Sequence, residues 1–104
     1  MQPDADQPTT QKHPVLTLDA LQAVIVTAED LSFTRAAQRL FMSTSGLSRR
    51  VRVVEHALQL EVFERTTRAV RLTPAGQALL PHIAKALAAI DDGVAAAQAA
   101  IRGD

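Results

Sequence analysis

The chain contains no cysteine, no tryptophan and no tyrosine, and aromatic residues make up only 3% of its 104 positions. The lack of cysteine excludes disulfides and thiol chemistry, and it is typical of proteins from a reducing cytoplasm. No apolar run approaches the roughly 20 residues that span a bilayer, so we expect no membrane insertion. The amino terminus has no basic start followed by an apolar stretch, and we therefore expect no signal peptide.

The sequence also has no net charge, but its charges are unevenly distributed. Residues 1–31 carry one lysine against five acidic residues, a net charge of −4. Residues 32–73 carry eight arginines against three glutamates, a net charge of +5. Arginine presents a planar fork of donors that suits phosphates and guanine edges. The middle of the chain is therefore the part that can face a polyanion.

A hydrophobic fraction of 47% is enough for one domain with an aliphatic core. Residues 1–15 hold three prolines and few apolar residues, and we expect them to form a flexible extension. Apolar spacing and capping hydroxyls predict helices over residues 18–29, 33–40 and 44–58, with a tight turn between the last two. For the first helix the period predicts an inward face of Leu18, Leu21, Val24, Ile25 and Ala28.

Two features of the next helices bear on packing and on the surface. The adjacent alanines Ala36 and Ala37 leave room for another helix to cross closely. The third helix has an apolar arc made of Leu47, Val51, Val54 and Leu58. Its opposite face carries small hydroxyl residues and arginines, whereas Arg39 of the second helix is expected to be an ordinary surface residue.

After residue 58 the spacing of apolar residues is no longer helical. Residues 62–65 and 69–72 form two strand-like runs, joined by a turn with Arg68 at its tip. Thr73 and Pro74 mark a new helix start, and an alanine-rich helix follows to about residue 101. Its apolar stripe has coiled-coil spacing, and we expect it to pair with a second copy of the chain through Ile83, Leu87, Ile90, Val94, Ala97 and Ile101. The alternative is that the stripe folds back on the first helix.

Three helices and a hairpin predict a mainly α winged helix-turn-helix domain over residues 16–73, followed by a linker helix over residues 74–104. In such a domain the third helix enters the major groove, where serines let the backbone approach and arginines reach guanine or phosphate. The residues expected to face the DNA backbone or minor groove from this reasoning are Ser43, Arg52, Arg65, Arg68 and Arg71.

The motifs SFTRAAQRL (32–40), LSRRVRVVEHAL (47–58) and VFERTTRAVRLTPAG (62–76) occur in this order. With the helix that follows, they make residues 16 to about 100 resemble the DNA-binding domain and linker helix of the LysR-type transcriptional regulators. The resemblance implies backbone contacts from Thr34 and Arg35, an antiparallel pairing of linker helices, and base-edge contacts from Thr44, Ser45, Ser48 and Arg49. The sequence departs from the family at Thr44, commonly glutamine, and at Gln59, usually glycine.

The leading functional hypothesis is sequence-specific binding of double-stranded DNA by a bacterial transcription regulator, as a homodimer on a dyad-symmetric operator. Such a regulator is expected in the cytoplasm, at the nucleoid. The family's effector-binding domain has no counterpart in this sequence, and whether the full-length assembly is a dimer or a tetramer stays open. The alternative is a dimerising adaptor, which would carry leucine, methionine or acidic residues on the third helix. No metal is expected, because the histidines are scattered over His13, His56 and His82. No cofactor or enzymatic activity is expected either, because the serines lack nucleophile-elbow glycines and no acid–base pair is placed by spacing.

Overall fold

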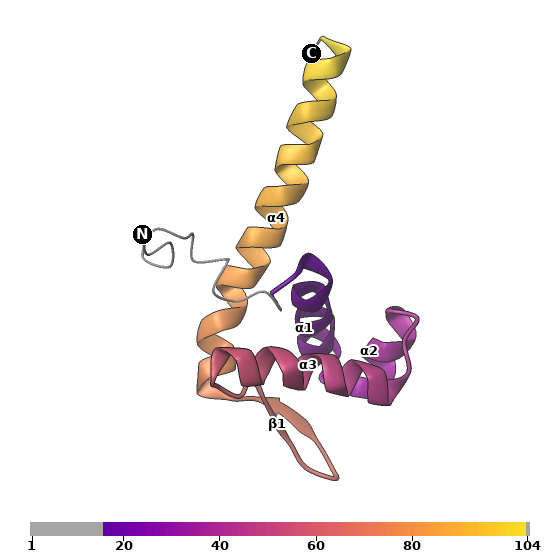
Figure 1. The fold of residues 1–104 in the computed structure, drawn as a ribbon, viewed down its shortest axis with the longest axis vertical. Coiled ribbons are helices and arrows are strands. Elements are labelled where there is room, and N and C mark those ends of the chain that lie inside the picture. The colour runs from indigo at the N-terminus through magenta and orange to yellow at the C-terminus, as the bar shows by residue number, and fades with distance from the viewer. Residues whose placement is uncertain (1–15, 104) are drawn as a thin grey trace, which may run out of the picture.

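A computed structural model describes residues 16–103, and the extension predicted for residues 1–15 lies outside the described residues. The elements follow in the order α1 (Leu18–Asp30), α2 (Phe33–Arg39), α3 (Thr44–Leu58), β1 (Phe63–Arg65), β2 (Val70–Leu72) and α4 (Pro74–Arg102). Three short helices gather at one end, beside a two-stranded hairpin, and the long α4 projects away from them (Figure 1). The predicted mainly α winged helix-turn-helix fold with a long last helix is confirmed.

A hydroxyl side chain caps the start of every helix. Each capping residue has an extended backbone, and its side-chain oxygen accepts a hydrogen bond from the backbone N–H three positions later. A cap of this kind stabilises a helix by about 1 kcal/mol. The predicted helix starts are therefore confirmed at all four capping residues, Thr17, Ser32, Ser43 and Thr73.

Left-handed backbone follows each of the first three helices at a residue other than glycine, whereas α4 ends at Gly103. The φ angle is 46° at Leu31, 56° at Phe41 and 58° at Gln59. A side chain in this region meets its own carbonyl group, a strain that glycine avoids. At Gln59 the side-chain Nε2 donates to the carbonyl oxygen of His56 at 2.8 Å, which adds one bond to the cap. The α3 terminus thus keeps a left-handed cap without the glycine that the family usually places there.

The core lies where α1 is enclosed by α2, α3 and α4. Ala36 and Ala37 are fully buried, as the predicted close crossing requires. The predicted inward face of α1 needs correction, because Leu18 is exposed and, apart from Val24, its other members are only half-buried. Helices press on α1 from several sides, and small residues allow their closest approach. The buried side chains of α1 are accordingly Ala20, Ala23, Val24, Val26 and Thr27.

The wing is the antiparallel pair β1 and β2, in which Phe63 lies opposite Leu72. Thr66 closes its turn, since its backbone N–H donates to the carbonyl of Ala69 at 2.9 Å. The Oγ1 of Thr66 also accepts from the backbone N–H groups of Arg68, at 3.2 Å, and Ala69, at 3.0 Å. The predicted hairpin with Arg68 in its turn is confirmed.

Gly76 lies where the first turn of α4 meets the chain just before β1. A Cβ atom built on Gly76 would overlap the carbonyl oxygen of Val62 and lie 3.1 Å from its carbonyl carbon. The same carbonyl accepts a hydrogen bond from the backbone N–H of Thr73 at 3.0 Å. Because backbone atoms cannot rotate away as a side chain can, this close approach requires glycine.

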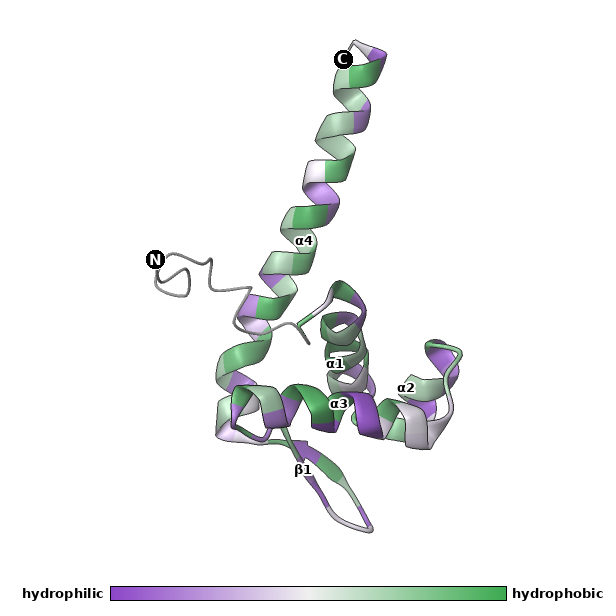
Figure 2. Ribbon diagram, in the orientation of Figure 1, coloured by the Kyte–Doolittle hydropathy of each residue, from purple (hydrophilic) through white to green (hydrophobic). Residues whose placement is uncertain are grey.

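The apolar stripe of α4 is divided between the domain and the solvent. Ile83 is buried in the core and Leu87 packs partly against it, whereas Val94 is 52% exposed. Apolar segments continue along the projecting part of α4 to its end (Figure 2). Assignment of Ile83 to the dimer interface is thereby corrected, because its side chain already belongs to its own domain. The part that remains accessible, called here the distal stripe, is Leu87, Ile90, Val94, Ala97 and Ile101.

Candidate nucleic-acid interface

The outward face of α3 is polar and exposed. Leu47, Val51 and Val54 are buried on its inner face, and Leu58 is half-buried, so the predicted apolar arc is confirmed. In Figure 1, α1 lies on one side of α3 and the hairpin extends from the other. This arrangement gives a free surface formed jointly by α3 and the wing. The exposed residues of α3 on this surface include Thr44, Ser45, Arg49 and Arg52.

The amino terminus of α3 is suited to an anion. Ser43 Oγ accepts the hydrogen bond of the Gly46 N–H at 3.0 Å. The N–H groups of Thr44 and Ser45 stand in the first turn, where a helix offers them no acceptor of its own. The helix dipole adds partial positive charge at this end. A phosphate oxygen placed here would therefore meet donors that the fold leaves unused.

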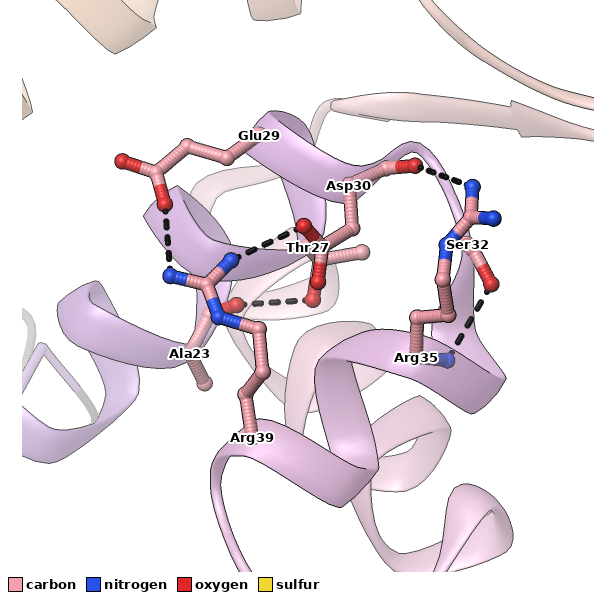
Figure 3. Close-up of polar contacts among 7 residues, drawn as sticks. All are labelled: Ala23, Thr27, Glu29, Asp30, Ser32, Arg35 and Arg39. Carbon is pink, nitrogen blue, oxygen red and sulfur yellow. Dashed lines mark hydrogen bonds and ion pairs between the residues drawn. The ribbon is translucent and has the colours of Figure 1, made fainter.

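Helix α2 contributes one accessible arginine and one that is paired. Arg35 donates through one nitrogen to the backbone carbonyl of Asp30 at 3.2 Å, and its neighbour Thr34 is exposed. Arg39 instead forms ion pairs with Glu29 at 3.1 Å and Asp30 at 2.8 Å (Figure 3). Hydrogen bonding to Glu29 raises the pKa of Arg39. Arg39 is thus a surface residue whose charge is already matched.

Arg65 was predicted to contact the DNA backbone, and its placement corrects that prediction. Its guanidinium donates to Ser48 Oγ at 2.6 Å and to Glu55 Oε1 at 3.0 Å. It also lies 4.3 Å from the centre of the Phe33 ring. Burial lowers the pKa of Arg65, and the charge of Glu55 acts in the opposite direction. The Arg65 side chain is only 17% exposed, and its guanidinium is occupied by Ser48 and Glu55. Arg65 therefore bonds to residues of its own domain behind the exposed surface.

Ser48 lies at the edge of the α3 face and is half-buried. Because its oxygen accepts the bond from Arg65, its own O–H proton remains available to an outside acceptor. The predicted base contact from Ser48 stays a prediction, now with a donor role.

Apart from those of Arg35, Arg39 and Arg65, the arginine side chains of residues 32–73 form no hydrogen bond or ion pair within the described part of the chain. Within residues 16–103, no carboxylate forms an ion pair with any of them, and all are exposed. Arg50 lies on the side of α3 that faces Asp19 of α1, away from the wing. The remaining unpaired arginines lie on the outer face of α3 or on the wing: Arg49, Arg52, Arg68 and Arg71.

Sequence reasoning missed Glu55 as a residue of this region. It is buried, and it lies beside Val54 in the apolar arc of α3. A carboxylate within an apolar arc, followed by an arginine in the next element, was the signal available. In the part of the chain that the structure describes, no group of three metal-ligating side chains occurs. None of the helices described there has the length and apolarity needed to cross a bilayer.

A family model described as bacterial regulatory helix-turn-helix protein, lysR family, matches residues 18–77, which is more than half of the chain. The chain belongs to the lysR family. Its relatives in this family include PgrR of Escherichia coli K12, 48% identical over 75 residues, which are 72% of this chain and 25% of PgrR. A transcriptional regulator of Azotobacter vinelandii is 40% identical over 77 residues, which are 74% of this chain and 54% of that protein.

Solved structures agree with this membership. The BenM_DBD in complex with benA site 1 DNA has a TM-score of 0.81 at 29% identity, covering 86% of this chain and all of that one. The CbnR_DBD–DNA complex has a TM-score of 0.78 at 28% identity, covering 83% of this chain and 99% of that one. This lysR-family chain spans only about half, or about a quarter, of the length of the two regulators named above.

Proposed function

We propose that this chain binds double-stranded DNA with sequence specificity, as the DNA-binding part of a bacterial transcription regulator. The observation that carries the proposal is the division of the arginines. Arg39 and Arg65 are each paired with carboxylates of the same domain, whereas the arginines on the outer face of α3 and on the wing are unpaired and exposed. A fold that pairs some arginines and leaves those of α3 and the wing unpaired presents the unpaired ones to a polyanion.

Within this surface we assign different tasks to α3 and the wing. The short side chains at the start of α3 let its backbone approach base edges in the major groove, and arginine reaches guanine N7 and O6. Arg68 in the wing turn enters the narrow, electronegative minor groove. The residues proposed for base edges are Thr44, Ser45, Ser48 and Arg49, and those proposed for phosphates are Thr34, Arg35, Ser43, Arg52 and Arg71.

We further propose that two chains pair through the distal stripe. Ile90, Val94 and Ile101 are 42%, 52% and 85% exposed, and nothing else in the described part of the chain covers them. Apolar residues at heptad spacing on a projecting helix are stabilised by pairing with a like helix. An antiparallel pair of α4 helices presents two α3 surfaces to a dyad-symmetric operator, with successive major grooves about 34 Å apart.

For the whole protein we propose control of transcription in the bacterial cytoplasm, at the nucleoid. Two observations support this proposal. The relatives are transcriptional regulators, and the similar BenM_DBD and CbnR_DBD structures are complexes with DNA. The adaptor alternative calls for leucine, methionine or acidic residues on the outer face of α3, and that face instead carries hydroxyl groups and arginines.

The test is selection from a random pool of DNA duplexes, followed by sequencing of the retained molecules. We expect enrichment of an inverted repeat, with retention that falls steeply as salt rises, because phosphate contacts release counterions. An enriched single half-site would support base readout and reject the paired arrangement. Absence of retention at low salt would reject DNA binding altogether.

A further inference from the structure

The wing is joined to α3 by a buried carboxylate. Glu55 is the only charged residue that is buried in the described part of the chain. Its Oε2 accepts hydrogen bonds from the backbone N–H groups of Val62, at 2.8 Å, and Phe63, at 3.1 Å. Its Oε1 accepts from Arg65 at 3.0 Å. One side chain of α3 therefore holds three donors from the segment that leads into and forms β1.

Arg65 extends this connection to two further residues. From β1 it donates to Ser48 of α3 at 2.6 Å and lies over the Phe33 ring of α2. That ring meets the ring of Phe63 edge-on, with centroids 5.7 Å apart. Arg65 thus contacts α2 and α3 while it belongs to the wing. We call the connected group formed by Glu55, Arg65, Ser48 and Phe33 the latch.

The wing is too short to hold its direction without contacts to the rest of the domain. Its two strands have three residues each, and an isolated two-stranded hairpin is marginally stable in water. The angle between the hairpin and the helices is therefore set by contacts where β1 and β2 join the rest of the domain. Only Thr66 and Thr67 separate Arg65 from Arg68, so a change of angle at the base displaces the side chain in the turn.

We propose that Arg65 is a positioning residue that fixes the wing against α3, so that Arg68 and α3 engage DNA as one rigid unit. This inference rests on the proposed function. Arginine suits the task because its planar fork bonds two acceptors at once and its face stacks on an aromatic ring. A lysine carries the same charge, but its ammonium group has neither the rigid planar fork nor a flat face to stack on Phe33.

The test removes the latch without leaving a lone buried charge. In the double variant Glu55→Gln, Arg65→Met, the introduced amide oxygen still accepts from the backbone, and the introduced thioether still packs on Phe33. Removing only one partner would leave the other charge unpaired and destabilise the domain. Glu29→Gln, Arg39→Met is the matched control, because it likewise removes one negative and one positive charge, from a pair that does not touch the wing.

Affinity for the selected operator is measured with and without Arg68→Ala in the native, latch-free and control backgrounds. We expect Arg68→Ala to weaken binding roughly tenfold in the native and control backgrounds and less than about twofold without the latch. Arg49→Ala, on α3 itself, is expected to weaken binding equally in all three. If the double variant is not folded by circular dichroism, Arg65→Lys alone replaces it, with an expected loss of about threefold for Arg68→Ala.

Several results would overturn the inference. An equal loss from Arg68→Ala in every background would show that the wing is positioned without Arg65. No loss in the native background would show that Arg68 is not delivered to DNA. Losses from Arg49→Ala and Arg68→Ala that shrink together would indicate a loosened domain. If the native chain binds no duplex, the proposed function fails first, which is a distinguishable result.

Discussion

Replacing Gly76 by alanine tests the close approach between α4 and the residue that precedes β1. The added Cβ overlaps the carbonyl oxygen of Val62, so either the first turn of α4 or the backbone of Val62 must move. Overpacking of a well-packed site costs about 1–3 kcal/mol, and a gain of up to about 1 kcal/mol from helix propensity opposes it. Movement also weakens the bond from the Thr73 N–H to the same carbonyl. We expect the free energy of unfolding to fall by about 2 kcal/mol.

Gly93 provides the matched control, because it lies in the same helix with nothing within 4 Å of a built Cβ. Gly93→Ala is expected to leave stability unchanged or to raise it by up to about 1 kcal/mol. Both variants are compared by urea unfolding followed by circular dichroism, at one protein concentration because association adds apparent stability. If Gly76→Ala were as stable as Gly93→Ala, the close approach would not constrain this chain and the reasoning would be refuted.

Three further changes test separate parts of the structure. Glu55→Leu removes the shared acceptor of two backbone N–H groups and a guanidinium. Urea unfolding should show that the free energy of unfolding falls by about 3–5 kcal/mol. A fall no larger than that of an ordinary surface substitution would contradict the role of Glu55. The Val94→Asp variant should sediment as a single chain and keep its helical circular dichroism signal. Ile83→Ala, in the core, should instead lower the free energy of unfolding by about 2–5 kcal/mol. If Val94→Asp still sedimented with the mass of two chains, the distal stripe would not be the pairing surface. Arg49→Ala should lower discrimination at one base position per half-site by roughly 1–3 kcal/mol, with Arg39→Ala as the control, and an unchanged base preference would reject that contact.

Local chemistry explains why the helix and strand limits could be predicted from the sequence. Thr17, Ser32, Ser43 and Thr73 each cap the backbone within three positions of themselves, so the sequence alone contains both partners of the bond. The turn of the wing is equally local, since Thr66 bonds to residues two and three positions away. The exposed face of α3 followed from the burial of its apolar arc.

The remaining features depend on partners far apart in the sequence. Arg65 and Arg68 look alike in a basic segment, but Arg65 meets Glu55 ten positions away and Ser48 seventeen positions away. Periodicity likewise assigns Ile83 to a stripe but leaves open whether this stripe packs on the first helix or on a second chain, and in the structure the part at Ile83 packs into the core, where α4 contacts α1. Which arginine is neutralised and which stays free is decided by tertiary packing, and so is the part of the stripe that remains exposed.

The unbroken helix α4 makes reach and direction depend on residue number. Each residue adds about 1.5 Å of length and turns the helix by about 100°. Ile83, seated in the core, and Ile101, near the helix end, are therefore about 27 Å apart along the axis. Deleting one residue between them would shorten the helix slightly but swing its outer surface by about 100° relative to α3, whereas deleting seven would nearly restore the direction. A change of length in this segment therefore keeps the direction of the outer surface only when it adds or removes close to a whole number of turns, as about seven or eleven residues do.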